Sequence, residues 1–212
     1  ETPDSLPDIV LTGLDTLDDF GTILDGRFDF DRDGVNDLLV GAVQAGGSPP
    51  PKPGAAYVFT GNRLLLGITV PEFTFTGEFP MNFFGGTVAA LGDIDADGYD
   101  DVISGAYFYC EADTHYGRAY VHFGKDGTSS PWEHPDMIFT GRSGSDFLGG
   151  CVGAPGDING DGFSDLFTGQ DGYYGPIGWL FYGNGTLSGG IDTSYADVTI
   201  YGNLTYTTDH YT

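Results

Sequence analysis

The chain has 212 residues, of which 7 are basic and 31 acidic, so its formal net charge is −24. Such an acidic surface repels the phosphates of nucleic acids and disfavours contact with anionic membranes. No apolar run approaches the roughly 18–20 residues that a membrane-spanning helix requires. Apolar residues still make up 40% of the chain and aromatic residues 15%. That content can form the core of one folded domain, so the charge does not indicate disorder.

Glycine and proline set the fold class. The 36 glycines and 12 prolines are spread along the chain, and they leave almost no window for a helix of 10–12 residues. Short aromatic and β-branched runs lie between the glycine turns, a pattern typical of β-strands. We therefore predict an all-β protein that forms a single domain over residues 1–212.

An internal repeat organises the chain. An aspartate-rich segment of nine residues occurs at Asp29–Asp37, Asp93–Asp101 and Asp157–Asp165, with starts spaced by 64 residues. Three further landmarks keep this spacing: a Phe-Gly or Leu-Gly pair before the segment, a Gly-Ala or Gly-Gln pair after it, and a Thr-Gly pair. The chain is therefore three copies of one unit, at about residues 14–77, 78–141 and 142–202.

Each unit contains four short runs with strand character. The first follows the Phe-Gly pair, as in Phe84 to Leu91. The other three are expected at Leu38–Ala42, Ala55–Thr60 and Phe73–Gly77, at Val102–Ala106, Arg118–Phe123 and Met137–Gly141, and at Leu166–Gly169, Ile177–Tyr182 and Val198–Gly202. A further copy of the fourth strand is expected near the N-terminus, within residues 8–13 (Ile9 to Gly13). Four-stranded antiparallel units in tandem are typical of β-propeller blades, and a solenoid is the alternative.

The aspartate-rich segments have the pattern of calcium-binding loops. Carboxylates at positions 1, 3, 5 and 9 supply hard oxygen ligands, position 7 offers its carbonyl, and the glycine at position 6 permits a sharp turn. No cysteine or histidine lies in any loop, which favours Ca²⁺ over zinc or copper. We predict three Ca²⁺ ions, bound by Asp29, Asp31, Asp33, Val35 and Asp37, by Asp93, Asp95, Asp97, Tyr99 and Asp101, and by Asp157, Asn159, Asp161, Phe163 and Asp165.

These loops are not EF-hands. An EF-hand has a bidentate glutamate at position 12 and a helix on each side. Position 12 is Val40, Ser104 or Thr168, each within a run of β character. We therefore expect calcium loops between strands, and we expect them to be poorly ordered without the metal because their carboxylates repel one another.

The order of these motifs resembles the FG-GAP repeat of integrin α-subunit β-propellers. The second unit fits best, with Phe84-Gly85, the Asp93–Asp101 loop and Gly105-Ala106. The first unit has Phe28 where a glycine usually precedes the loop, and the third has Leu148 and Gln170 at the Phe and Ala positions. The resemblance covers about residues 8–202. It implies calcium-stabilised blades, an extracellular or cell-surface location, and an adhesive or scaffolding role rather than catalysis.

The number of blades departs from that family. Seven such repeats close an integrin-like propeller, and propellers in general have 4–8 blades. Three blades imply a fragment of a longer chain or a propeller completed by other subunits. The extra strand at Ile9–Gly13 has no predicted partner, and an unpaired strand favours pairing with a neighbouring chain. Self-association into a ring or filament is therefore expected.

Other candidate sites stand apart from the loops. Asn184 and Asn203 begin N-glycosylation sequons, Cys110 and Cys151 are candidates for a disulfide between blades, and residues 49–53 form a proline-rich loop. No motif of a hydrolase, metalloprotease or nucleotide-binding enzyme is present, so we predict no enzymatic activity. Aromatic loop residues could instead bind glycans or a partner, although packing between blades is the commoner role: Tyr107, Phe108, Tyr109, His115, Tyr116, Tyr173 and Tyr174.

Two functions follow from the sequence. The first is an extracellular calcium-binding module that acts in adhesion or as a building block of a surface assembly, with copies of itself or other extracellular proteins as partners. The alternative is a carbohydrate-binding or glycan-processing domain that uses the aromatic loops.

Overall fold

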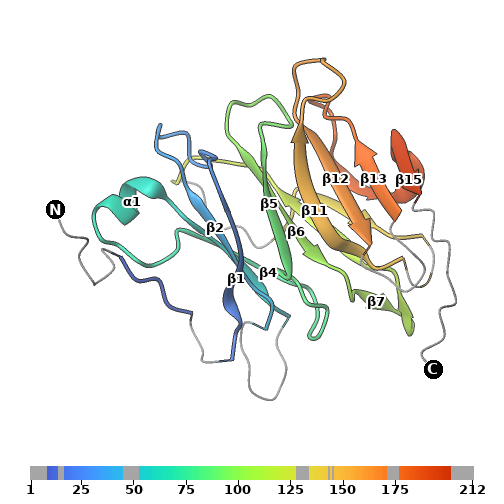
Figure 1. The fold of residues 1–212 in the computed structure, drawn as a ribbon, viewed down its shortest axis with the longest axis horizontal. Helices are drawn as coiled ribbons and strands as arrows, with labels where there is room; N and C mark the ends of the chain where they lie inside the picture. The colour runs from blue at the N-terminus through green and yellow to red at the C-terminus, as the bar shows by residue number, and fades with distance from the viewer. Residues whose placement is uncertain are drawn as a thin grey trace, which may run out of the picture.

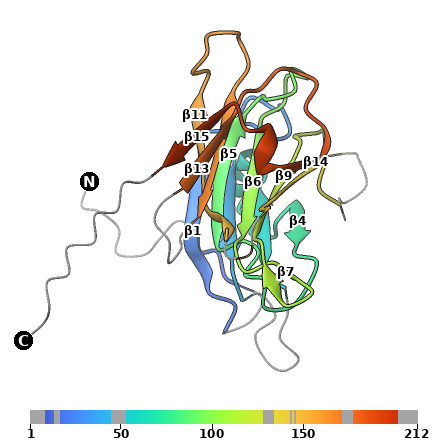
Figure 2. The ribbon, with the colours of Figure 1, turned by 90° about the vertical axis from the view of Figure 1, so that its right-hand side faces the viewer.

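Strands form nearly all of the regular structure. A computed structural model describes residues 9–13, 17–44, 53–127, 134–142, 144, 146–170 and 177–201. Three mainly antiparallel sheets follow one another along the molecule, with blue to cyan, green to yellow and orange to red strands in Figure 1. The view in Figure 2 shows that their strands run in similar directions. The prediction of an all-β, propeller-like architecture is confirmed.

The first blade is a four-stranded sheet in sequence order. It comprises β1 (Phe20–Gly26), β2 (Leu38–Ala42), β3 (Ala55–Phe59) and β4 (Phe73–Thr76). A short helix, α1 (Gly61–Leu65), follows β3. No helix in the described part of the chain is long and apolar enough to cross a membrane.

The second and third blades repeat this order. The second comprises β5 (Thr87–Gly92), β6 (Asp101–Ala106), β9 (Arg118–His122) and β10 (Met137–Thr140). The third comprises β11 (Leu148–Gly156), β12 (Asp165–Gln170), β13 (Ile177–Phe181) and β15 (Val198–Tyr201). A hairpin of β7 (Cys110–Glu111) and β8 (Thr114–His115) extends beyond β6. The 3-10 helix η1 (Thr193–Tyr195) precedes β15.

Two features differ from the expected strands. Residues 9–13 lie outside any strand, so the expected extra strand is not formed. The physical reason is that β3, β9 and β13 already have a fourth strand beside them, which leaves no free third strand for another copy. The second sheet also gains a fifth strand, β14 (Gly189–Asp192), which pairs in parallel with β10.

The core lies between neighbouring blades. One apolar cluster joins residues of the first sheet, such as Leu39 and Phe75, to residues of the second, such as Phe84 and Tyr120. A second cluster joins the second and third sheets in the same way. The facing sides of neighbouring sheets therefore bury each other, whereas a third cluster lies within the first blade and is packed with Leu11 and Leu64.

His122 is an exception among these apolar contacts. It lies on β9, is 5% exposed, and its ring stacks on Phe75 of the first blade with centroids 3.8 Å apart. Its Nδ1 atom is buried, and among the described residues no group forms a hydrogen bond with it. Burial, with a smaller effect from the charge of Lys125, lowers the pKa of His122 to about 3. Phenylalanine takes the same place in the other blades, at Phe59 and Phe181.

We therefore predict that His122→Phe makes the protein more resistant to acid. Because the pKa of His122 is lower in the folded state than in the unfolded state, its contribution to stability is complete above about pH 6.5 and is lost as the pH falls toward 3. The loss reaches up to about 1.4 kcal/mol per pH unit. Urea denaturation of both proteins between pH 4 and 7 measures how the free energy of unfolding of each depends on pH. An equal dependence on pH for the two proteins would contradict the prediction.

Candidate metal centres

The three aspartate-rich loops share one edge of the molecule. Each connects the first and second strands of its blade, and all three lie at the top of Figure 1. The glycine at position 6 has a φ of 88° at Gly34, 91° at Gly98 and 97° at Gly162. A side chain would be strained in this left-handed conformation, so the glycine makes the sharp turn that closes each loop.

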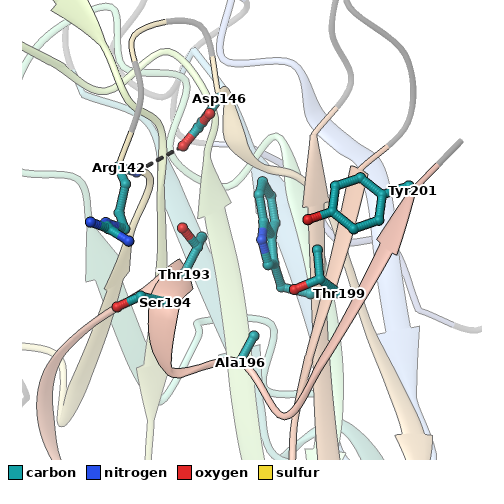
Figure 3. Close-up of a pocket in the computed structure, with 8 residues that line it drawn as sticks. Arg142, Asp146, Thr193, Ser194, Ala196, Thr199 and Tyr201 are labelled. Carbon is teal, nitrogen blue, oxygen red and sulfur yellow. Dashed lines mark hydrogen bonds between the residues drawn. The ribbon is translucent and has the colours of Figure 1, made fainter.

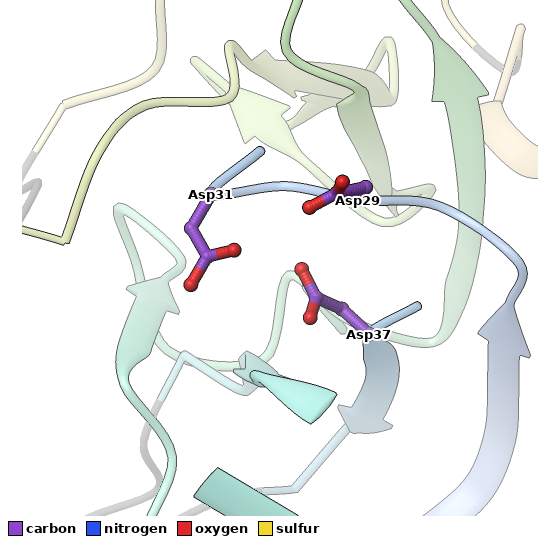
Figure 4. A group of neighbouring side chains, drawn as sticks. All are labelled: Asp29, Asp31 and Asp37. Carbon is purple, nitrogen blue, oxygen red and sulfur yellow. The ribbon is translucent and has the colours of Figure 1, made fainter. Parts of the chain in front are cut away.

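Carboxylates gather in the first two loops. Oxygen atoms of Asp29, Asp31 and Asp37 lie within 4.8 Å of one another, and Figure 4 shows these side chains turned toward a common space. Asp93 and Asp95 form the equivalent group with Asp101. Of the four carboxylates predicted to bind each ion, at positions 1, 3, 5 and 9, those at positions 1, 3 and 9 therefore lie close together in both loops.

Position 5 has a different local role. Asp33 Oδ1 accepts a hydrogen bond from the Val35 N–H at 2.7 Å, and Asp97 Oδ1 accepts one from the Tyr99 N–H at 2.9 Å. These bonds shape the turn around the glycine. Neither aspartate belongs to the group of three that lies within 4.8 Å.

Position 9 carries a structural role that the sequence pattern did not reveal. Asp101 is fully buried and accepts two backbone hydrogen bonds at 2.9 Å, from Ile94 within the loop and from Gly124 just after β9. Asp37 accepts equivalent bonds at 2.7 and 2.8 Å from Phe30 and Gly61. The ninth carboxylate thus fastens each loop to the end of the third strand in its own blade.

A glycine after each third strand makes this attachment fit. A Cβ atom at Gly61, Gly124 or Gly183 would collide with backbone of the aspartate-rich loop, at the carbonyl oxygens of Asn36, Asp100 and Ser164 respectively. This contact was missed at the level of the sequence. The signal that could have revealed it is a glycine that recurs two residues after every third strand.

The pKa values show that the ionised state of these clustered carboxylates is unfavourable without a cation. Burial, reinforced by neighbouring carboxylates, raises the pKa of Asp37 to about 7 and that of Asp101 to about 8, although backbone hydrogen bonds oppose the shift. Burial and then the charge of Asp33 raise the pKa of Asp31 to about 6. A divalent cation would compensate both the lost solvation and the repulsion.

The residues fit such a cation in one further respect. Asp93 Oδ1 is buried, and no group in the described part of the chain forms a hydrogen bond with it. A buried carboxylate oxygen without a partner is costly. Since Asp93 is one of the three clustered carboxylates, this atom has the position and the chemistry of a metal ligand.

The third loop has the same backbone with one charge fewer. Asp165 accepts backbone hydrogen bonds from Ile158 and Gly183 at 2.6 and 3.0 Å. Asn159 replaces the third-position aspartate, and its Nδ2 donates to Asp161 Oδ2 at 2.8 Å. Only two carboxylates remain at positions 1, 3 and 9, which makes this loop the weakest candidate of the three.

Neighbouring loops are also bonded to each other. The Asp29 N–H donates to Asp100 Oδ2 at 2.8 Å, and the Asp100 N–H donates to the Asp29 carbonyl at 3.2 Å. The Arg32 guanidinium lies 5.6 Å from the centroid of the Tyr99 ring. The order of one loop therefore affects the next blade as well as its own.

The cysteine prediction is not supported. Cys110 and Cys151 are both free in the structure, so the expected disulfide between blades is absent. Cys110 lies on the β7–β8 hairpin opposite His115, whereas Cys151 lies on β11 opposite Gly169. The two cysteines thus belong to different strand ladders, which the order of strands alone did not resolve.

The structure describes the first of the two N-glycosylation sequons. Asn184 is exposed, and its Oδ1 accepts hydrogen bonds from the backbone and hydroxyl of Thr186. Asn203 lies outside the described residues, as do Tyr173, Tyr174 and most of the proline-rich loop.

The described aromatic loop residues pack on one another. Tyr107 stacks on Phe83 with centroids 5.4 Å apart, and Phe108 lies 4.1 Å from the His115 ring. Arg118 covers Tyr109 at 3.6 Å. These contacts support the packing role over an open platform for sugars.

A separate pocket of about 560 Å³ lies beside the third blade (Figure 3). Its lining combines charged, hydroxyl and aromatic side chains, namely Arg142, Asp146, Trp179, Thr193, Ser194, Ala196, Thr199 and Tyr201. None of these residues belongs to the metal loops or to the aromatic loops singled out from the sequence.

Comparison with known proteins relates this sequence to FG-GAP repeat proteins. The FG-GAP repeat model matches residues 84–122. The chain is 30% identical to integrin alpha-5 of Xenopus laevis over 152 residues, and 31% identical to integrin alpha-2 of Mus musculus over 160 residues. These matches cover 68% and 71% of this chain but only 14% and 13% of the relatives. Integrin alpha-3 of Cricetulus griseus is 40% identical over 85 residues, which are 40% of this chain and 8% of that protein.

The glycine after the third strand gives a direct test of the loop attachment. We predict that Gly124→Ala destabilises the protein by about 1–3 kcal/mol, because the new methyl group must displace the Asp100 carbonyl. Gly190→Ala is the matched control, since a Cβ there meets no atom within 4 Å. Thermal unfolding of both variants measures the effect, and equal midpoints would show that the contact is unimportant.

Proposed function

We propose that this chain, a member of the FG-GAP repeat family similar to integrin α subunits, is an extracellular calcium-binding module with an adhesive or structural role. The observation that carries the proposal is the pair of carboxylate clusters, in each of which oxygen atoms of three aspartates, one of them buried, lie within 4.8 Å of one another. Oxygen ligands in this number, with no nitrogen or sulfur, favour Ca²⁺. The location and the role are proposed because the relatives are integrin α subunits.

Three ions are proposed, one for each loop. The carboxylates of positions 1, 3 and 5 and the carbonyl of position 7 would hold the ion, with the backbone-bonded acid of position 9 completing the site. The carbonyls are those of Val35, Tyr99 and Phe163. Bound ions would fix each loop to its third strand and to the next loop, so calcium would stabilise the packing between blades.

The proposed activity is binding rather than catalysis. Extracellular proteins and further copies of this chain are the proposed partners, and the charge of −24 disfavours nucleic acids. The glycan-binding alternative has less support, because the described aromatic residues of the rim pack on one another. The exposed Asn184 is proposed as a glycosylation site.

Calcium removal tests the proposal. A ligand that binds only the folded state stabilises it by mass action, so we expect the unfolding midpoint to rise on addition of Ca²⁺ and to fall with a chelator. Asp93→Asn should remove one ion, counted by calorimetric titration. Asp113→Asn, which changes an exposed acid outside the loops, is the control. A midpoint that chelator does not change would refute calcium binding.

The three loops should also differ in affinity. Because affinity depends on the number of charged ligands, we predict that Asn159→Asp tightens the weakest site by about tenfold. Asn184→Asp adds the same charge at an exposed position outside the loops and should leave that site unchanged. Calorimetric titration with Ca²⁺ resolves the two cases; identical isotherms for both variants would contradict the assignment of the third loop.

A further inference from the structure

We propose that the first and second metal loops bind calcium cooperatively, and that Asp100 is the positioning residue that couples them. The proposal rests on the calcium binding proposed above. It deepens that function because it states which two of the three sites affect each other. The third site binds independently of the other two.

A continuous chain of hydrogen bonds joins the first two sites. Asp37 Oδ2 accepts a bond from the Phe30 N–H at 2.7 Å. The carbonyl of that same peptide group belongs to Asp29, and it accepts a bond from the Asp100 N–H at 3.2 Å. The peptide group of the Asp100 N–H carries the carbonyl of Tyr99, which is the proposed ligand at position 7 of the second loop. A ligand of the first ion is therefore linked to a ligand of the second through two peptide groups.

The Asp100 side chain adds a second connection. Its Oδ2 accepts a hydrogen bond from the Asp29 N–H at 2.8 Å, so one residue of the second blade holds both backbone groups of Asp29. Hydrogen bonds to a carboxylate are stronger than those between neutral groups. In the chain Asp100 lies between Tyr99 and Asp101, which are both proposed ligands of the second ion. Fixing these two ligands therefore also fixes the groups that position Asp29.

The end of the third strand of the second blade makes a third connection. The Gly124 N–H donates to Asp101 Oδ1 at 2.9 Å. The N–H of the next residue, Lys125, donates to the Phe30 carbonyl at 2.9 Å. Since Phe30 also donates to Asp37 Oδ2, this path again runs from an acid at position 9 of the second loop to the acid at position 9 of the first.

The connection between the second and third loops is weaker. Ser164 takes the place of Asp100 in the third loop. Its N–H lies 3.5 Å from the Asp93 carbonyl, which is longer than an ordinary hydrogen bond between backbone groups. The serine side chain is also one atom shorter than that of Asp100 and carries no charge. The same chain thus contains one strongly connected pair of loops and one weakly connected pair.

Cooperativity follows because an ion in one loop reduces the entropy cost of ordering the other. An ion in the second loop would hold Tyr99 and Asp101, and through Asp100 it would hold Asp29. The first loop then loses less conformational freedom when it binds its own ion, which produces positive cooperativity. The coupling is reciprocal, so an ion in the first loop favours the second site by the same factor. Repulsion between the two cations opposes the coupling, and salt at about 0.15 M screens it.

A calcium titration that resolves the individual loops tests the proposal. The N–H of the position-6 glycine donates to the first aspartate of its own loop, at 2.8 Å for Gly34 and at 2.9 Å for Gly98 and Gly162. The NMR signal of each glycine amide therefore reports the state of its own loop. In the unmodified chain at about 0.15 M salt, the Gly34 and Gly98 signals should change together, and with a steeper dependence on Ca²⁺ than the Gly162 signal.

A pair of substitutions measures the coupling. Asp31→Ala removes a carboxylate from the first site, and the Gly34 signal shows whether that site stays empty while the second one fills. It should weaken the second site, read at Gly98, by about tenfold. Combined with Asp100→Ser, which introduces the residue of the third loop, Asp31→Ala should change the second site by less than about twofold. The Gly162 signal is the internal control and should not respond to Asp31→Ala.

Asp100→Asn separates the hydrogen bond from the charge. It removes the same charge as Asp100→Ser, but it keeps an oxygen that can accept a bond from the Asp29 N–H. The tenfold effect of Asp31→Ala should therefore persist in this variant. A loss of coupling as large as that caused by Asp100→Ser would overturn the assignment to the hydrogen bonds.

Equal affinity of the second site with and without Asp31→Ala, in the chain that retains Asp100, would overturn the inference outright. That result is distinguishable from failure of the proposed function. Glycine signals that do not respond to Ca²⁺ at all would refute calcium binding, whereas signals that respond independently leave calcium binding in place and remove only the coupling. The dispersion of each NMR spectrum shows that the variant is folded.

Discussion

The constraint behind this structure is that a single blade cannot bury its own apolar faces. A four-stranded sheet exposes two faces to its surroundings, and neither can be covered from within the sheet. The first two blades solve this by packing Leu39 and Phe75 against Phe84 and Tyr120. The same packing recurs between the second and third blades. The apolar residues therefore repeat at the same positions in each unit, and the second blade must fit a neighbouring blade on each of its faces.

The metal loops also help to hold neighbouring blades together. Apolar burial is non-directional, so polar contacts at the ends of the strands help to fix how neighbouring sheets align. Here the ninth carboxylate ties its loop to the glycine after the third strand, and the Asp29–Asp100 bonds tie one loop to the next. Repelling acids are thereby placed at the junction of two blades, where a bound cation would strengthen both attachments together.

The periodic features could be predicted from the sequence. The second, third and fourth strands begin and end within one or two residues of the expected positions, because glycine turns and alternating apolar residues are local signals. The convergence of Asp29, Asp31 and Asp37 was predictable for the same reason. All of these features are set by residues close together in the chain.

Features that depend on distant segments were not predictable. The parallel strand β14 joins β10 across some fifty residues, and nothing in its Gly-Gly-Ile-Asp sequence indicates that partner. The contact of Gly124 with the Asp100 carbonyl needs the third strand to return beside the loop.

The third blade departs from the repeat on the face turned away from the second blade. Where it packs against the second blade, its residues Leu148 and Trp179 are large and buried. On its outer face, smaller Gly178, Val198 and Ile200 stand where the second blade has Ala119, Met137 and Phe139. Its inner face is thus fitted to a neighbour within the chain, whereas its outer face keeps the register and the apolar character with less bulk. A sheet face that is exposed to water does not need apolar side chains and could carry polar ones instead. Val198 and Ile200 nevertheless are apolar in a chain with a net charge of −24, so this face keeps the pattern by which the other two blades pack.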